Sequence, residues 1–182
     1  MTSSKRPKIE DILIVDDEAD ICDLVSGILD DEGFASREAH HSDAALAAIE
    51  LRRPTLVLLD IWLQGSRLDG LALLAQLKKE HPALPVVIMS GHGTVETAVQ
   101  AIKLGAYDFI EKPFKADRLI LVIQRAIEAS QLKRENEELR LRSGVDTEIV
   151  GRSAVINQLC QSIERVAPTN SRVLITGPAG SG

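Results

Sequence analysis

The chain has 182 residues, 45% of them hydrophobic, and a formal net charge of −6 at pH 7. This length allows one domain of ordinary size and a remainder, and the acidic balance excludes nucleic-acid binding through a large basic surface. No apolar run approaches the roughly 18–20 residues that span a bilayer. Cys22 and Cys160 belong to no metal-binding or CxxC grouping. We therefore expect a soluble cytoplasmic protein with no membrane contact and with both cysteines reduced and buried.

Hydrophobic runs and helical patterns alternate along the chain after a polar tail over residues 1–8. The runs predict strands at Ile12–Val15, Phe34–Ala39, Leu56–Leu59, Val86–Met89 and Tyr107–Glu111. Apolar residues at helical spacing predict helices over 21–29, from a cap at Ser42 or Asp43 to before Pro54, over 70–81, over 94–104 and from Ala116. The alternation predicts an α/β fold: a doubly wound, five-stranded parallel sheet of the flavodoxin-like order 2-1-3-4-5.

Reactive side chains follow four of these predicted strands. Asp16 and Asp17 follow the first strand, Asp60 the third, Ser90 the fourth and Lys112 the fifth. The carboxyl ends of parallel strands meet at one edge of a sheet, so these groups should converge there. Taken singly, the aspartates are most often helix caps or strand-ending acids, and Lys112 a surface lysine. Their joint position favours a site for phosphoryl transfer.

The predicted site has a defined chemistry. Three close carboxylates repel one another unless a cation compensates, and oxygen ligands of this kind suit Mg²⁺. One oxygen of Asp60 could then attack phosphorus and form an acyl phosphate. Lys112 would contribute a positive charge to the phosphoryl oxygens, and Ser90 a hydroxyl. The sequence leaves the isomer of the Lys112–Pro113 bond open.

Residues 129–147 form a charged, helix-favouring linker. One heptad register places Ala129 and Asn136 at position a, with Leu132 and Leu139 at d, which suits a parallel coiled coil. About two heptads are too few to decide between a coiled coil and a single helix. A lone solvated helix remains an equally good interpretation.

Residues 148–182 begin a new pattern. A helix over 153–166 precedes a predicted strand, Val173–Thr176, which runs into Gly177, Gly180 and Gly182. These glycines match the opening of a phosphate-binding P-loop, and the chain stops one residue before its lysine. We interpret the segment as the opening piece of an ATPase domain. A Gly-rich tail is the simpler alternative.

The motifs ILIVDD, LVLLD, VVIMSG and AYDFIEKPF resemble the receiver domain of two-component response regulators over residues 9–128. The resemblance implies that Asp60 is the phosphoacceptor and that Ser90 and Lys112 contact the phosphoryl group. It implies a Mg²⁺ site made by Asp16, Asp17, Asp60 and the backbone carbonyl of Trp62. Phe109 falls at the family's switch aromatic, which follows the Ser90 hydroxyl, and is equally well a core aromatic.

The loop from Asp60 to Gly70 departs from this pattern, since it lacks the usual proline and is about two residues longer. Together with IVGRSAVINQL, this loop makes the whole chain resemble the NtrX-like regulators of the NtrC family. Membership implies a sensor histidine kinase as partner and a homodimer through helix 94–104, strand 107–111, the last receiver helix and the linker helix. It also implies a sigma-54-interacting AAA+ ATPase domain, incomplete here, and contacts with sigma-54 RNA polymerase and DNA through missing domains.

We therefore expect a Mg²⁺-dependent phosphorylation switch that controls the pairing and output of a nitrogen-related transcription activator, and not an enzyme. The first alternative is a dimerisation module that works without phosphorylation. A second is a haloacid-dehalogenase-type hydrolase, which is weaker because Trp62 stands where the general acid would be.

Overall fold

The computed structural model describes residues 10–91, 94–142, 153–167, 169 and 174. They include one five-stranded sheet in the order β2-β1-β3-β4-β5, in which every neighbouring pair is parallel. The strands are β1 (Asp11–Val15), β2 (Ala35–Ala39), β3 (Leu56–Asp60), β4 (Val86–Ser90) and β5 (Asp108–Glu111). The predicted fold class and strand order are confirmed.

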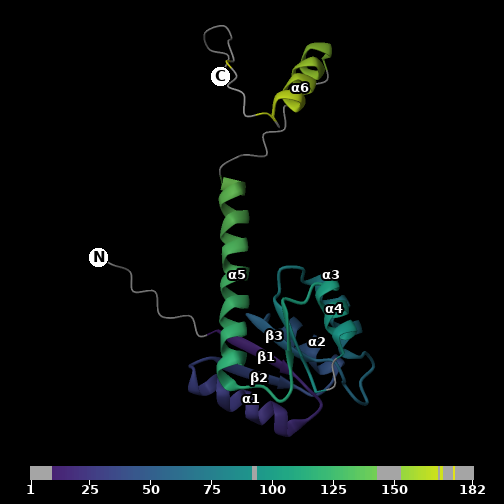
Figure 1. The fold of residues 1–182 in the computed structure, drawn as a ribbon, viewed down its shortest axis with the longest axis vertical. Coiled ribbons are helices and arrows are strands. Elements are labelled where there is room, and N and C mark those ends of the chain that lie inside the picture. Colours follow the sequence, from purple (N-terminus) through teal and green to yellow (C-terminus); the bar gives the residue numbers. More distant parts are fainter. Residues whose placement is uncertain (1–9, 92–93, 143–152, 168, 170–173, 175–182) are drawn as a thin grey trace, which may run out of the picture. The chain divides into compact units, whose positions relative to one another are not determined.

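Helices alternate with these strands as the sequence predicted (Figure 1). They are α1 (Ala19–Asp31), α2 (Ser42–Leu51), α3 (Gly70–Glu80), α4 (Val95–Lys103), α5 (Ala116–Arg142) and α6 (Ala154–Val166). Helix α5, at 27 residues, is the extended helix that was expected after the receiver-like segment. The compact unit that holds the sheet runs from Met1 to Asn136, and α6 belongs to a second unit. The N-terminal tail, most of the predicted strand Val173–Thr176 and the glycines 177, 180 and 182 lie outside the described residues.

The sheet is covered on both faces because consecutive residues of its apolar strands point in opposite directions. In β1, Ile12 and Ile14 join a core with helices α1 and α5, whereas Leu13 and Val15 join a core with α2, α3 and α4. All four side chains are fully buried. This two-sided burial explains why the strand runs are continuously hydrophobic and leaves only the sheet's ends for polar chemistry.

Helix α5 changes its surroundings along its length. Leu119, Ile123 and Ala126 are fully buried against the sheet. Burial of one such leucine or isoleucine contributes about 1.5–3 kcal/mol, so these residues fasten the first half of the helix. Leu132 and Leu139 are 59% and 63% exposed. The second half therefore presents apolar side chains that are mostly exposed.

Two details of the sequence prediction were wrong. The N-cap of α2 is His41, whose Nδ1 accepts the N–H of Ala44; neither Ser42 nor Asp43 is the cap, because both already lie in the helix. Cys160 on α6 is partly exposed, whereas Cys22 is buried as expected, and both are free thiols. Within the residues described, no helix has the length and apolar character needed to cross a membrane.

Candidate functional site

Three carboxylates gather where β1 and β3 end. These strands are neighbours, with Val15 paired to Leu59, so the residues that follow lie side by side. One oxygen each from Asp16, Asp17 and Asp60 lies within 4.8 Å of the others. Asp16 is fully buried and Asp60 is 4% exposed. The cluster expected from the strand order is present.

Lys112 brings a positive charge to this cluster from the end of β5. Its Nζ lies 2.6 Å from Asp16 Oδ2 and 3.1 Å from Asp60 Oδ1, and its side chain is 10% exposed. Its backbone N–H donates to the carbonyl of Ser90 at 2.8 Å, which fastens the end of β5 to β4. The Lys112–Pro113 peptide bond, whose isomer the sequence left open, is cis.

Burial and neighbouring charges act on the pKa values of both Asp60 and Lys112, and both pKa values are raised. Burial raises the pKa of Asp60 above its ordinary value; the charge of Lys112 opposes that rise and the charge of Asp16 adds to it. Burial alone would lower the pKa of Lys112, but the hydrogen bond to Asp16 and the charges of both aspartates outweigh it, so that pKa is raised. The ammonium is therefore held charged, while the cost of burying the Asp60 carboxylate is only partly offset by Lys112.

The two oxygens of Asp60 differ. Oδ2 accepts the N–H of Trp62 at 2.9 Å. Oδ1 is buried, and its polar neighbour is the Lys112 ammonium at 3.1 Å, an ion-pair partner. The three carboxylates form an oxygen donor set that fits Mg²⁺, a cation that prefers carboxylates and carbonyls.

The site opens into a cavity of about 630 Å³. Four of its lining residues were predicted as site residues: Asp17, Asp60, Trp62 and Lys112. The sequence did not point to the other three, Glu18, Gln64 and Gly91. Glu18 also lies 3.8 Å from the Lys112 ammonium. The run of three acids at 16–18 was the available signal for Glu18. Gln64 and Gly91 could not be found, because their positions depend on loop conformation.

Ser90 and Phe109 occupy the places that the strand order predicts. Ser90 ends β4 and is fully buried, at the same edge of the sheet as Asp60. Phe109 lies in β5, partly buried, and packs against the core formed with α2, α3 and α4. This position agrees with both earlier interpretations of Phe109, as a switch residue and as a core aromatic.

The long loop after Asp60 is anchored to the start of α2. Ser42 Oγ, in a buried residue, accepts the N–H of Leu68, and the N–H of Ser42 donates to Ser66 Oγ, both at 3.2 Å. Arg67 pairs with Asp43 at the surface, at 2.9 Å. The second half of this loop is thus held against the start of α2.

The comparison with protein families agrees with this geometry. The family described as "Response regulator receiver domain" matches residues 12–124. The chain belongs to this family. The match covers the whole sheet except the first residue of β1, together with α1 to α4 and the first part of α5.

Three similar proteins show which kind of family member the receiver domain resembles. The nitrogen assimilation regulatory protein NtrX of Azorhizobium caulinodans is 62% identical over 172 residues, 94% of this chain and 38% of the relative. The crystal structure of NtrX from Brucella abortus is 67% identical with a TM-score of 0.81, over 96% of this chain and 38% of that one. A beryllofluoride-activated NtrC4 receiver domain dimer, solved in solution, is 38% identical with a TM-score of 0.62, over 66% of this chain and 98% of that one. The receiver domain is thus of the NtrX and NtrC kind, and the chain spans less than two fifths of the NtrX proteins it matches.

Proposed function

We propose that Asp60 accepts a phosphoryl group from the phosphohistidine of a sensor histidine kinase, the partner that membership in the response regulator family implies. The observation that carries this proposal is Asp60 Oδ1, a buried carboxylate oxygen that faces the Lys112 ammonium at 3.1 Å. The ion pair that holds this oxygen is not lost in the attack, because the same ammonium can pair with the incoming phosphoryl oxygens.

In the proposed step, Asp60 Oδ1 forms a bond to phosphorus while the phosphorus–nitrogen bond of the phosphohistidine breaks and the histidine leaves with the electron pair. The Lys112 ammonium then turns from the carboxylates toward the phosphoryl oxygens, and the Ser90 hydroxyl donates to one of them. Asp16, Asp17, Asp60 and the backbone carbonyl of Trp62 would hold Mg²⁺, whose charge neutralises the phosphoryl oxygens when it is bound.

The residues of the site favour a phosphorylation switch over an enzyme that hydrolyses its acyl phosphate rapidly. The side chain two residues after Asp60 is Trp62, whose indole N–H is not acidic enough to protonate a leaving group, and it is 56% exposed at the cavity. The acyl phosphate would therefore persist and act as a signal.

Phosphorylation tests this assignment directly. Incubation with acetyl phosphate and Mg²⁺ should add one phosphoryl group to the chain, detected by intact mass. Asp60→Ala should abolish the addition, whereas Asp43→Ala, which removes an exposed carboxylate, should leave it unchanged. Addition of a phosphoryl group to Asp60→Ala would contradict the proposal.

We propose that the output is a homodimer through α4, β5, α5 and the helical linker. Val95, Val99 and Ile102 form an exposed apolar row at helical spacing on α4, and Leu132 and Leu139 add a second row on α5. The related NtrC4 receiver domain is a dimer in its beryllofluoride-activated form. A modification at Asp60 would shift the equilibrium between the free and the paired state of these surfaces.

The monomer–dimer equilibrium separates this switch from a module that pairs without phosphorylation. By sedimentation, we expect phosphorylation to change the dimer dissociation constant at least about fivefold, the lower end of typical coupling. Replacing Leu132 and Leu139 together by lysine should weaken pairing. The control Leu51→Lys, at an 87% exposed position on α2, should not. A dimerisation constant that phosphorylation leaves unchanged would favour the phosphorylation-independent module.

We further propose the domain organisation 9–128 for the receiver domain, 129–147 for the linker and 148–182 for the opening piece of a sigma-54-interacting AAA+ ATPase domain. In it Gly177, Gly180 and Gly182 would begin the phosphate-binding loop. The identity to NtrX, which continues over 94% of the chain, supports this assignment. Regulation of nitrogen-related genes through sigma-54 RNA polymerase and DNA would then require the rest of such a protein.

A further inference from the structure

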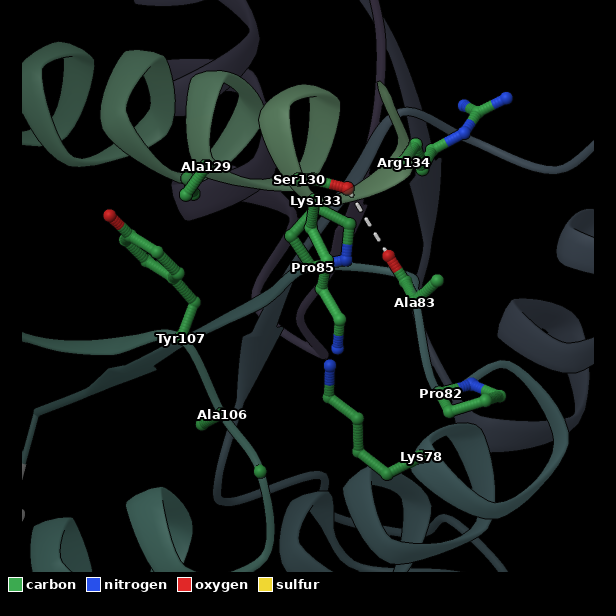
Figure 2. Close-up of a pocket in the computed structure, with 12 residues that line it drawn as sticks. Lys78, Pro82, Ala83, Pro85, Ala106, Tyr107, Ala129, Ser130, Lys133 and Arg134 are labelled. Atoms are coloured by element: carbon green, nitrogen blue, oxygen red, sulfur yellow. Dashed lines mark hydrogen bonds between the residues drawn. The ribbon is translucent and has the colours of Figure 1, made fainter. Parts of the chain in front are cut away.

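A second cavity lies at the opposite edge of the sheet from Asp60. It has a volume of about 330 Å³ and is bordered by Pro85, just before β4, and by Ala106 and Tyr107, just before β5. The end of α3 and the middle of α5 complete its walls (Figure 2). Every lining residue belongs to the unit that holds the sheet, so the cavity is formed within one compact body. We call it the base pocket.

Two lysines from different helices meet in the base pocket. Lys78 comes from the last turn of α3 and Lys133 from α5, and Figure 2 shows their ammonium groups pointing toward each other. Burial and the charge of Lys133 both lower the pKa of Lys78. The Lys78 ammonium donates to the backbone carbonyl of Leu84 at 2.5 Å. Among the described residues, none of the ion pairs involves either lysine.

The position of Lys78 alone has a simple structural explanation, since a lysine in the last turn of a helix interacts favourably with the helix dipole. Lys133 is an exposed residue of α5, nine residues before the helix ends, and its ammonium is nevertheless directed at Lys78 (Figure 2). Two like charges that converge from separate elements repel one another, and a carboxylate to compensate them is missing from the pocket lining. The arrangement is one that an anion between them would stabilise.

The rest of the lining suits a small ligand. Pro82, Ala83, Pro85, Ala106 and Ala129 form short apolar walls, and Tyr107 stands on the side next to Ala129 (Figure 2). Ser130 Oγ donates to the carbonyl of Ala83 at 3.2 Å, which holds α5 against the loop before β4. Arg134 also borders the pocket, and its guanidinium points away from the two lysines (Figure 2). The volume falls at the lower end of the range for small-molecule sites.

We propose that the base pocket binds a small dianion, either a phosphate or a compact dicarboxylate, between the ammonium groups of Lys78 and Lys133. The bound anion joins the end of α3 to the part of α5 that lies just before Asn136. The site is separate from the phosphorylation site in position and in chemistry, since it needs neither Asp60 nor Mg²⁺.

The proposal can be tested on the full chain in Mg²⁺-free buffer at constant ionic strength. Inorganic phosphate and succinate are titrated separately, with chloride as the reference anion, and the backbone amide signals of Ala83, Ala106 and Tyr107 are followed by NMR. We expect saturable shifts with at least one of the two anions. Lys78→Met and Lys133→Met should each weaken its binding at least about tenfold, the effect of losing one charge-assisted contact. Lys79→Met, which changes the neighbouring exposed lysine, should leave binding unchanged.

Both pocket variants remove a repelling charge, so they should remain folded, which thermal unfolding checks. A stronger response to phosphate or to succinate identifies the class of the anion, and either result supports the site. Shifts that match those in chloride, or equal binding by Lys78→Met, Lys133→Met and the unmodified chain, would overturn it.

Discussion

Gly70→Ala is expected to destabilise the receiver domain by about 3 kcal/mol, the upper end of the usual cost of overpacking. Gly70 is the first residue of α3, and its N–H donates to the carbonyl of Ile61 at 2.9 Å. A Cβ at this position would overlap the carbonyl oxygen of Asp60 and lie 2.6 Å from the Cα of Ile61. Both neighbours are backbone atoms at the end of β3, so no side-chain rotation can relieve the overlap. Urea unfolding followed by circular dichroism measures the change.

Gly27→Ala is the matched control for this substitution. Gly27 lies inside α1, is exposed, and an added Cβ would meet nothing within 4 Å. Alanine there should stabilise the domain by about 0.5–1 kcal/mol, because it restricts the unfolded chain and favours the helix. If Gly70→Ala unfolds at the same urea concentration as the unmodified chain, the close approach of α3 to Asp60 is wrong. Since one of the displaced atoms is the backbone carbonyl oxygen of Asp60, Gly70→Ala should also slow phosphorylation.

The sheet and the position of the carboxylates were predictable because they follow from simple rules. Continuous apolar runs such as Leu56–Leu59 indicate strands buried on both faces, and the strand order then brings the residues after β1 and β3 together. Neither step needs knowledge of loops. For the same reason, the sequence placed Ser90 and Lys112 at the correct edge of the sheet without fixing any distance among them.

The features that the sequence did not reveal depend on loop conformation. The buried hydroxyl of Ser42 was interpreted as a helix cap, but its hydrogen-bond partner is Leu68, 26 residues away. The steric need for glycine at position 70 arises from the path of the backbone at Asp60 and Ile61. The base pocket joins Lys78 to Lys133, and no local pattern relates residues so far apart. Contacts of this kind require the folded chain.

Lys112→Met is expected to destabilise the domain by about 3–5 kcal/mol at pH 7 without Mg²⁺, the usual result of removing one member of a buried ion pair. The Lys112 side chain is 10% exposed and its partners Asp16 and Asp60 are 0% and 5% exposed, so water cannot replace the lost charge. Methionine keeps most of the length of the apolar stem, and the loss is therefore one of charge. Lys115→Met, at an exposed position three residues along, should change stability by no more than about 0.5 kcal/mol.

The pH dependence of this loss distinguishes a charge effect from poor packing. The folded pKa of Asp60 is already above its ordinary value of 3.8, and removal of Lys112 should raise it further, since the charge of Lys112 opposes the rise. A carboxyl group with a raised folded pKa binds more protons in the folded state, so its cost is fully present above the folded pKa and disappears as the pH falls toward 3.8. The deficit of Lys112→Met should accordingly shrink between pH 7 and pH 4, and Mg²⁺ at pH 7 should also reduce it by supplying the missing charge. A deficit that is constant with pH and insensitive to Mg²⁺ would show that Lys112 acts through packing and would remove the electrostatic basis of the site.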